Sequence, residues 1–446
     1  MTATSQNESQ NKSRQFAFDV VKRLNDAGYT AYWAGGCVRD YLLGKIPKDY
    51  DVATNAIPSE VEQLFGKKQT LAVGASFGVM IVRAPRGVEN VEVATFRTDG
   101  SYLDGRRPDS VEFSTPEEDA QRRDFTINGM FYDPLQQQVY DFIGGERDLA
   151  QGIVRAIGDP HERIQEDKLR MLRAVRFTAT LDFKLDKTTT SAIQEMATEL
   201  HAVSPERITQ ELHKMLLDVH RWRAMQLANQ VGLIDVIFPE LITCKQQPTI
   251  KNNGSPTKNN LWDVTLHQLQ LLEETTFELA MAILLSGTIA HETASKHDPL
   301  TCTTSLPNAV ILKICRRLKF SNQQMGHIGW LTKHQKTLSH AKELSMAQLK
   351  RIFTNPFAND LLKLFHLQTI ATQSELSPVL FCEEFLASTP QDEINPAPLM
   401  TGDILIQAGY QPGPRFRELL ETIRNAQLNN EIQTQEEALQ LAKEVQ

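Results

Sequence analysis

Two aspartates that are two residues apart are the most informative chemical feature of the sequence. Asp49 lies just before residues 50–54 and Asp51 lies within them, and the composition of these residues predicts a short strand. Residues i and i+2 of a strand point to the same face, with Cα atoms about 7 Å apart. Carboxylates placed in this way can hold divalent metal ions about 4 Å apart, as in-line phosphoryl transfer requires. An Asp-x-Asp pair alone is more often a solvated turn or strand face, so its neighbours decide the interpretation.

A glycine pair and an arginine shortly before the aspartates favour a phosphate ligand. Gly35 and Gly36 allow the backbone to approach a phosphate closely, and Arg39 can bind its oxygens. A Gly-Gly pair by itself is commonly a loop. The combination of glycines, arginine and two aspartates predicts a metal-dependent nucleotidyl transfer site.

Glu92 is a candidate for a third acidic group. It lies in residues 91–94, which are predicted to form another strand. On a strand beside the aspartates, its carboxylate could bind metal or act as the base for an attacking hydroxyl. An exposed strand charge is the more common meaning of such a glutamate.

Residues 122–130 combine charged, polar and apolar side chains in a way that suits a nucleotide. Arg123 could bind a triphosphate oxygen with two hydrogen bonds. Asp124 and Asn128, four apart and therefore on one face of a predicted helix, could contact ribose hydroxyls. The alternative is the start of a surface helix with Asp124 as its N-cap.

Residues 166–176 place an acceptor and a donor three apart on a predicted helix. Asp167 and Arg170 would then be neighbours that complement the Watson–Crick edge of a base without a nucleic-acid template. Arg173 and Arg176 continue the basic strip toward the phosphates. In isolation, such charges are usually the solvated face of a helix.

The elements that must position these residues change in type along the chain. The first part mixes the two kinds, with predicted helices at 16–27 and 38–43 and predicted strands at 32–34, 79–82, 91–94 and 139–142. From residue 160 onward the pattern is helical, with predicted helices over 162–180, 188–200 and 205–218. The fold class is therefore α+β, a head with a mixed sheet followed by all-helical parts.

The bulk composition is that of an ordinary soluble globular protein. The 446 residues are 41% hydrophobic and 23% charged, and the length suggests two to four structural units. The net charge of -8 does not identify a nucleic-acid binder, although binding requires only a local basic face.

Cysteine usage and the ends of the chain predict a cytoplasmic location. The five cysteines lack metal-ligand spacing, and an odd number argues against a disulfide framework. Residues 1–14 are polar, lack the apolar core of a secretory signal and are predicted to be a disordered lead-in. The longest apolar run, residues 279–285, is too short to span a bilayer, so no membrane association is expected.

Six motifs occur in an order and spacing that resemble motifs A to E of the class II tRNA nucleotidyltransferases, the CCA-adding enzymes. This family, the tRNA nucleotidyltransferase/poly(A) polymerase family, has polymerase β-like heads, and the resemblance covers roughly residues 30–218. The motifs are residues 35–40, 49–51, 122–128, 141–145, 166–170 and 204–208.

The resemblance implies a palm-like head followed by helical neck, body and tail domains. The expected boundaries are a lead-in at 1–14, a nucleotidyltransferase head at 15–158, a neck at 159–240, a body at 241–390 and a tRNA-binding tail at 391–446.

The resemblance also implies the ligands. Mg²⁺ would bind Asp49 and Asp51, with Glu92 assisting catalysis, and the partners would be tRNA, CTP and ATP. It makes no prediction about the oligomeric state. The expected nucleotide-binding residues are Gly35, Gly36, Arg39, Arg123, Asp124, Asn128, Asp167, Arg170, Arg173 and Arg176.

Two segments bear on substrate choice within the family. Bacterial poly(A) polymerases carry a basic pair in the segment that matches residues 73–78, where this chain has Ala75 and Ser76. Residues 98–108 resemble the flexible loop of enzymes that add the terminal A, which argues against a CC-only enzyme. Template-independent CCA addition is therefore the expected activity.

Three alternatives stay open at this level. The protein could add only the terminal A, or it could be a poly(A) polymerase. An RNA-binding adaptor with an inactive head is disfavoured because every expected acidic and arginine position is filled.

The body resembles an HD-type phosphohydrolase fold that has lost its chemistry. His267 fills the first histidine position, but the expected His-Asp pair is replaced within residues 284–287. The pair His297 and Asp298 lies in a loop-like context, so no hydrolase metal site is predicted. Residues 401–415 resemble the tail segment that grips the tRNA elbow.

Overall fold

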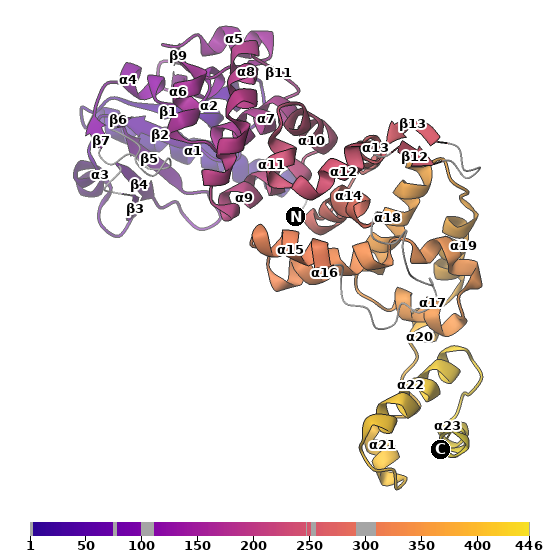
Figure 1. Ribbon diagram of the computed structural model, residues 1–446. Coiled ribbons are helices and arrows are strands. Elements are labelled where there is room, and N and C mark those ends of the chain that lie inside the picture. The colour runs from indigo at the N-terminus through magenta and orange to yellow at the C-terminus, as the bar shows by residue number, and fades with distance from the viewer. Residues whose placement is uncertain are drawn as a thin grey trace. The chain divides into compact units, whose positions relative to one another are not determined.

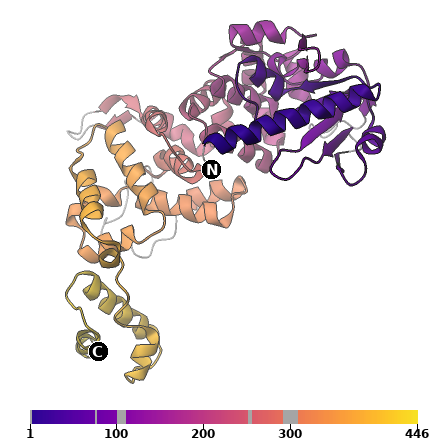
Figure 2. The same cartoon turned by 180° about the vertical axis from the view of Figure 1, so that it is seen from behind.

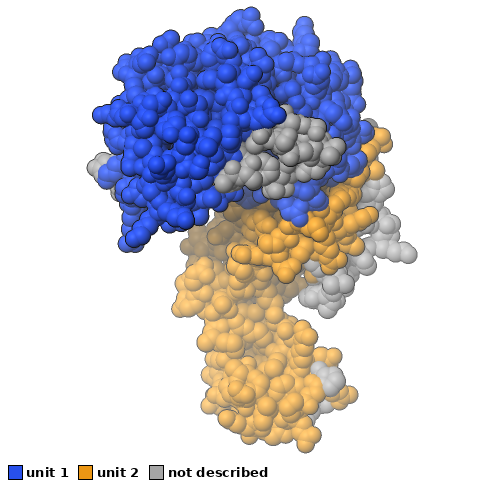
Figure 3. All heavy atoms as spheres, turned by 90° about the vertical axis from the view of Figure 1, so that its left-hand side faces the viewer, with its two compact units in different colours: residues 1–237 blue, residues 238–446 orange. Residues whose placement is uncertain are grey.

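The computed structural model divides into two compact units, residues Met1–Ile237 and Phe238–Gln446 (Figure 3). The division lies close to the expected boundary between neck and body, and the finer boundaries remain predictions. The structure describes residues 3–74, 78–99, 111–246, 248–250, 256–290 and 309–445.

A seven-stranded sheet is the framework of the first unit (Figure 1), with the strand order β3-β4-β5-β2-β1-β8-β9. Its strands β2 and β5 are parallel, and the other neighbours are antiparallel. The strands are β1 (Ala31–Ala34), β2 (Asp51–Thr54), β3 (Thr70–Gly74), β4 (Val79–Val82), β5 (Val91–Thr95), β8 (Phe131–Asp133) and β9 (Gln138–Tyr140). Short pairs add β6 (Arg97–Asp99) with β7 (Val111–Phe113), and β10 (Ile153–Val154) with β11 (Lys184–Leu185).

Helix α1 (Ala3–Asp26) runs along this sheet (Figure 2) and contacts β1, β2 and β5. The prediction of a disordered lead-in is wrong for residues 3–14, which form the first turns of this helix. Ser13 is buried and accepts the backbone N–H of Glu89, and the guanidinium of Arg14 lies 5.3 Å from the centre of the Tyr41 ring. The amphipathic helix predicted over residues 16–27 therefore begins earlier than predicted, at Ala3.

The remaining helices of the first unit follow the predicted order with one break. The helix predicted over 162–180 is two helices, because Asp167 adopts an extended conformation with φ −147° and ψ 102°. The elements are α2 (Gly36–Leu42), α3 (Pro58–Phe65), α4 (Pro116–Gln121), η2 (Thr126–Asn128), α5 (Gly145–Gln151), α6 (Pro160–Glu166), α7 (Arg170–Thr180), α8 (Lys187–Met196), η3 (Ala197–Ala202), α9 (Pro205–Leu216), α10 (Arg221–Gln230) and α11 (Leu233–Ile237).

A small apolar cluster lies beneath the predicted site. Its buried members come from β1, β2, β8, α4 and the residue after β5, and they are Ala34, Ala53, Phe96, Ala120 and Phe131. Alanine at three of these positions lets a helix and two strands approach closely. Gly35 and Asp119, next to Ala34 and Ala120, and Asp51, two residues before Ala53, are thereby held on a tightly packed base.

The second unit is almost entirely helical among its described residues. Its last helices enclose a core of their own, formed by Met400, Leu405, Leu419, Ile423, Ala438 and Ala442. The described residues of this unit also include an antiparallel strand pair, β12 (Pro248–Ile250) and β13 (Pro256–Asn260). The helices are η4 (Pro239–Leu241), α12 (Ile242–Gln246), α13 (Leu261–Leu271), α14 (Phe277–Ala290), α15 (Ala309–Arg317), α16 (Asn322–His334), η6 (Thr337–Glu343), α17 (Met346–Phe353), α18 (Ala358–Ala371), α19 (Ser377–Ser388), α20 (Gln391–Ile394), α21 (Gly402–Gln407), α22 (Pro414–Leu428) and α23 (Gln435–Glu444).

In the described part of the chain, no helix combines the length and the apolar composition needed to cross a membrane. His267 is exposed on α13. The pair His297 and Asp298, the segment from Ala75 to Phe77 and most of the loop over 98–108 lie outside the described residues.

Candidate active site

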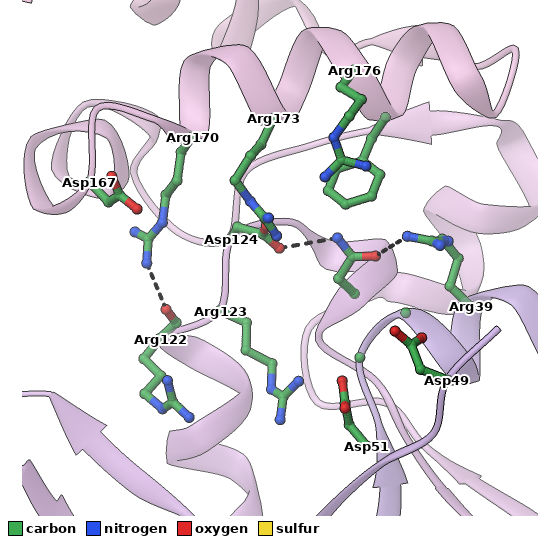
Figure 4. A pocket seen from close by; sticks show the side chains of 14 residues that line it. Arg39, Asp49, Asp51, Arg122, Arg123, Asp124, Asp167, Arg170, Arg173 and Arg176 are labelled. Atoms are coloured by element: carbon green, nitrogen blue, oxygen red, sulfur yellow. Dashed lines mark hydrogen bonds and ion pairs between the residues drawn. The ribbon is translucent and has the colours of Figure 1, made fainter. Parts of the chain in front are cut away.

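One cavity of about 510 Å³ in the first unit brings most of the predicted residues together (Figure 4). Among the predicted residues only Glu92 is not part of its wall, and Arg122 and Phe177 are additions that the sequence did not indicate. The lining residues are Gly35, Gly36, Arg39, Asp49, Asp51, Arg122, Arg123, Asp124, Asn128, Asp167, Arg170, Arg173, Arg176 and Phe177.

The turn between β1 and α2 forms one wall and requires glycine for two reasons. Gly35 has a φ of +75°, which favours glycine over residues with a side chain. A Cβ atom added there would lie 3.3 Å from Nη1 of Arg123 and 3.9 Å from Oδ2 of Asp51. The absence of a side chain therefore keeps the space between these two charged groups open.

Asp51 begins β2, and Asp49 lies two residues before it. Asp51 pairs in register with Ala34 at the end of β1 and with Glu92 on the parallel strand β5. Desolvation, together with the negative charges of Asp49 and Glu92, raises the pKa of Asp51 to about 7, while Arg123 opposes the shift. Carboxylates that destabilise one another in this way are suited to a bound cation.

Glu92 lies on the neighbouring strand in register with Asp51, as predicted, and its assisting role in catalysis stays a prediction. It is exposed and does not line the cavity. Among the described residues, no group of three His, Cys, Asp or Glu side chains could hold a metal ion. The carboxylates of the cavity wall that lie beside the glycine turn are those of Asp49 and Asp51.

Arg39 is a buried guanidinium in the wall beside the glycines. It donates through Nη1 to Oδ1 of Asn128 at 2.8 Å and through Nε to Oδ1 of Asp40 at 2.8 Å. Its Cζ atom lies 5.1 Å from the centre of the Phe177 ring. These contacts connect α2, η2 and α7 through one side chain.

The guanidinium of Arg123 is held by Asp119, a residue that the sequence does not mark as part of the site. Asp119 on α4 accepts two hydrogen bonds from Arg123 at 3.1 and 2.9 Å and two from Arg122 at 2.9 and 2.6 Å. Burial alone would raise the pKa of Asp119, but the charges of both arginines outweigh it and hold the pKa below its usual value. The i+3 and i+4 spacing of these charges was the available signal.

Asp124 and Asn128 lie close together, but not on one helical face as predicted. Asp124 follows the end of α4, and Asn128 belongs to η2. The carboxylate of Asp124 accepts hydrogen bonds from Nδ2 of Asn128 at 3.1 Å and from Nε and Nη2 of Arg173 at 2.8 and 2.5 Å. Although burial opposes ionisation, Arg173 and Asn128 lower the pKa of Asp124 to about 2.

Asp167 and Arg170 both line the cavity, and the prediction that one helix carries them is wrong. Asp167 is the C-cap of α6, and Arg170 begins α7 after a turn in which its N–H donates to the carbonyl of Asp167. Asp167 accepts two hydrogen bonds from Arg207 at 3.1 and 2.7 Å. Arg170 donates to Glu166 at 2.5 Å and to the carbonyl of Arg122 at 3.1 Å.

The face of α7 beyond Arg170 carries two more arginines around an aromatic ring. The Cζ atoms of Arg173 and Arg176 lie 5.3 and 4.0 Å from the centre of Phe177, the same ring that Arg39 contacts. Nε of Arg176 donates to the buried carboxylate of Glu211 at 2.6 Å. The i+3 spacing of the arginines indicated this face, whereas nothing in the spacing distinguished Phe177 from a core residue.

Three family models match the chain. Residues 31–155 match the "Poly A polymerase head domain" and residues 182–244 the "Probable RNA and SrmB- binding site of polymerase A". Residues 291–442 match a model of "tRNA nucleotidyltransferase domain 2".

Curated relatives include CCA-adding enzymes and poly(A) polymerases. A CCA-adding enzyme of Enterococcus faecalis is 37% identical over 71% of this chain and 69% of its own length. A CCA-adding enzyme of Lactiplantibacillus plantarum is 31% identical over 95% of this chain and 94% of its own. Poly(A) polymerase I of Escherichia coli is 41% identical over 50% of each, so the chain spans about half the length of that relative.

A solved structure agrees over nearly the whole chain. The CCA-adding enzyme of Bacillus stearothermophilus in complex with CTP is 26% identical, with a TM-score of 0.73 over 96% of this chain and 97% of that one. The Thermotoga maritima CCA-adding enzyme complexed with tRNA shares the fold, with a TM-score of 0.62.

Proposed function

The chain belongs to the class II tRNA nucleotidyltransferase/poly(A) polymerase family, and from this premise we infer that it adds CCA to the 3′ end of tRNA. The reaction uses CTP and ATP, releases pyrophosphate and needs no nucleic-acid template. The observation that carries this function is the single cavity that holds both the aspartate pair and a separate donor and acceptor pair for a base. Two CCA-adding relatives match 71% and 95% of the chain, whereas poly(A) polymerase I of Escherichia coli matches 50%, which favours CCA addition over poly(A) synthesis.

Mg²⁺ fits the aspartate end of the cavity. Asp49 and Asp51 would hold it, because two oxygen donors are what Mg²⁺ takes from a protein when substrate phosphates complete its coordination. Besides burial, the negative charges of Asp49 and Glu92 raise the pKa of Asp51, and a bound cation would relieve this repulsion. When bound, Mg²⁺ supplies activation of the tRNA 3′-hydroxyl and neutralises charge on the departing pyrophosphate.

The arginines of the cavity would bind and orient the triphosphate. Arg39 and Arg123 flank the glycine turn, and both are fixed by carboxylate or amide partners before the substrate arrives. A guanidinium that is already held loses little conformational entropy when it binds a phosphate. Alignment of the α-phosphate for in-line attack follows from this fixed cradle.

The other end of the cavity would select the base. Cytosine and adenine present an amino group and a ring nitrogen acceptor on the Watson–Crick edge, whereas uracil and guanine present a carbonyl where the amino group would be. The carboxylate of Asp167 accepts from the amino group, and the guanidinium of Arg170 donates to the ring nitrogen. UTP and GTP are rejected because a carbonyl oxygen would face the Asp167 carboxylate.

A direct assay distinguishes the family activities. Purified protein with Mg²⁺ is given tRNA transcripts that end before CCA, at C or at CC, together with CTP, ATP or both, and the products are sized by gel. Extension that stops at CCA establishes the function. Addition of one A to the CC-ended transcript alone would make the protein an A-adding specialist, and long A tracts would make it a poly(A) polymerase.

The surroundings of the thiols fit the cytoplasm as the place of this reaction. The four described cysteines, Cys37, Cys244, Cys315 and Cys382, are buried free thiols. Burial raises the pKa of Cys37 and Cys315 to about 12, which keeps them as neutral thiols.

A further inference from the structure

Asp119 is a buried carboxylate that serves two arginines of the cavity and no ligand directly. Its side chain is 1% exposed, and it does not line the cavity. One oxygen, Oδ1, accepts both hydrogen bonds from Arg122, and the other, Oδ2, accepts both from Arg123. A single negative charge therefore orients two positive charges.

The contact with Asp119 determines which part of Arg123 faces the cavity. Nε and Nη2 point to Asp119, so that edge of the guanidinium is occupied. Nη1 is the atom that would lie 3.3 Å from a Cβ on Gly35, beside the aspartate pair. The ring of Phe131, with its centre 5.0 Å from Cζ, limits movement of the guanidinium from another direction.

The carboxylate of Asp119 also connects the two arginines to strand β6. Oδ1 of Asp119 also accepts the backbone N–H of Arg97 at 3.3 Å, and Nε of Arg122 donates to the carbonyl of Arg97 at 3.0 Å. Arg97 begins β6, so α4 and β6 are fixed to each other under the two arginines. Asp119 is therefore placed to hold Arg123 and does not line the cavity in which a nucleotide would bind.

We propose that Asp119 is a positioning residue that presents Nη1 of Arg123 to the triphosphate of the incoming nucleotide. The inference rests on the proposed function, because it assumes that Arg123 binds that triphosphate. CTP and ATP share the triphosphate, so Asp119 sets the KM for both nucleotides to the same degree. Discrimination against UTP and GTP, which depends on Asp167 and Arg170, does not depend on Asp119.

The test compares Asp119→Asn with Glu117→Gln. Both changes remove one negative charge from α4, but Glu117 is exposed and lies outside the cavity. We expect Asp119→Asn to raise the KM for CTP and for ATP by about 10-fold or more, with a smaller change in kcat and an unchanged CTP-to-UTP preference. Inhibition by inorganic tripolyphosphate, which carries no base, weakens by a similar factor, and Glu117→Gln behaves as the parent protein.

A double variant shows whether the effect passes through Arg123. In an Arg123→Ala background, Asp119→Asn is expected to change the KM by less than about 2-fold, because the group that it positions is gone. An additional 10-fold rise there would overturn the proposal, as would a folded Asp119→Asn protein with unchanged KM and tripolyphosphate inhibition.

Two further outcomes separate this proposal from the function on which it rests. If Arg123→Ala itself leaves KM unchanged, the triphosphate role of Arg123 fails. If Asp119→Asn does not fold, Arg123→Lys takes its place, since lysine keeps the charge but cannot form the two-bond contact with one oxygen. It is expected to raise both KM values equally, and parental KM values would contradict the positioning role.

Discussion

Charged side chains of the cavity hold one another in place without a ligand. Arg207 fixes the carboxylate of Asp167, and Arg173 fixes that of Asp124, each with two hydrogen bonds. Such pairs restrict side-chain rotation before the nucleotide binds, which reduces the entropy that binding must overcome. A carboxylate oxygen that already accepts one hydrogen bond retains a lone pair for a substrate amino group.

Removal of one aspartate tests the metal-binding end at the residue scale. We expect Asp49→Ala to lower nucleotide incorporation by about 1,000-fold or more, because metal-assisted phosphoryl transfer loses one of its two carboxylates. The binding of tRNA, measured by filter retention, stays near that of the parent protein. Substantial turnover in Asp49→Ala would contradict the assignment of the metal site, and Glu117→Ala on the surface of α4 is the control.

Removal of the base-facing guanidinium tests the other end. Arg170→Ala is expected to reduce the preference for CTP and ATP over UTP by about 10-fold or more, because one hydrogen bond to the base edge is lost. Single-turnover incorporation of each nucleotide measures the preference. Unchanged selectivity would refute the role of Arg170 in base selection.

Elements place these side chains through turns that sequence periodicity does not describe. The turn at Gly35 joins β1 to α2, and the break at Asp167 separates α6 from α7. Because α7 begins at Arg170, the arginines that follow lie on one face, whereas Asp167 approaches the cavity from the preceding turn. Both turns put backbone in conformations that a regular helix or strand would not supply.

A pair of glycines provides a matched test at this scale. Gly28 and Gly35 both have positive φ, but only an added Cβ on Gly35 would meet the atoms of Arg123 and Asp51. We expect either substitution by alanine to lower the free energy of unfolding by about 1 kcal/mol. Only Gly35→Ala is expected also to lower kcat/KM, by about 10-fold or more. Equal activity of the two variants would mean that the space beside Gly35 has no catalytic importance.

The two compact units of the molecule differ in how acid acts on them. In the first unit, the lowered pKa of Asp124, about 2, contributes stability that is present above its unfolded pKa and lost as the pH falls toward 2. In the second unit, burial of His334 and the nearby charge of Lys333 lower the pKa of that imidazole to about 4. The unfolded chain then binds a proton between pH 6.5 and 4 that the folded unit does not, so stability falls as the pH falls through this range.

Acid is therefore expected to unfold the second unit before the first. Between pH 7 and pH 5, His334 should cost the second unit about 2 kcal/mol of stability. Hydrogen exchange at the two pH values measures each unit in the intact protein, and Trp330, whose ring centre lies 4.8 Å from that of His334, offers a fluorescence signal. His334→Leu should abolish most of the difference, and an equal loss in that variant would assign the acid sensitivity to other groups.

The sequence by itself determined the α+β class, the family and nearly all residues of the cavity wall. It could do so because catalytic groups recur at short spacings, such as the two-residue step from Asp49 to Asp51, and such spacings are visible without knowledge of the fold. Tertiary structure alone decided the partners of those groups. Arg207 meets Asp167 from 40 residues away, Phe177 brings three guanidinium groups together, and Glu92 stays outside the cavity although its strand neighbours that of Asp51. Contacts between distant segments depend on how the sheet and helices pack, and a local pattern of residues does not predict that packing.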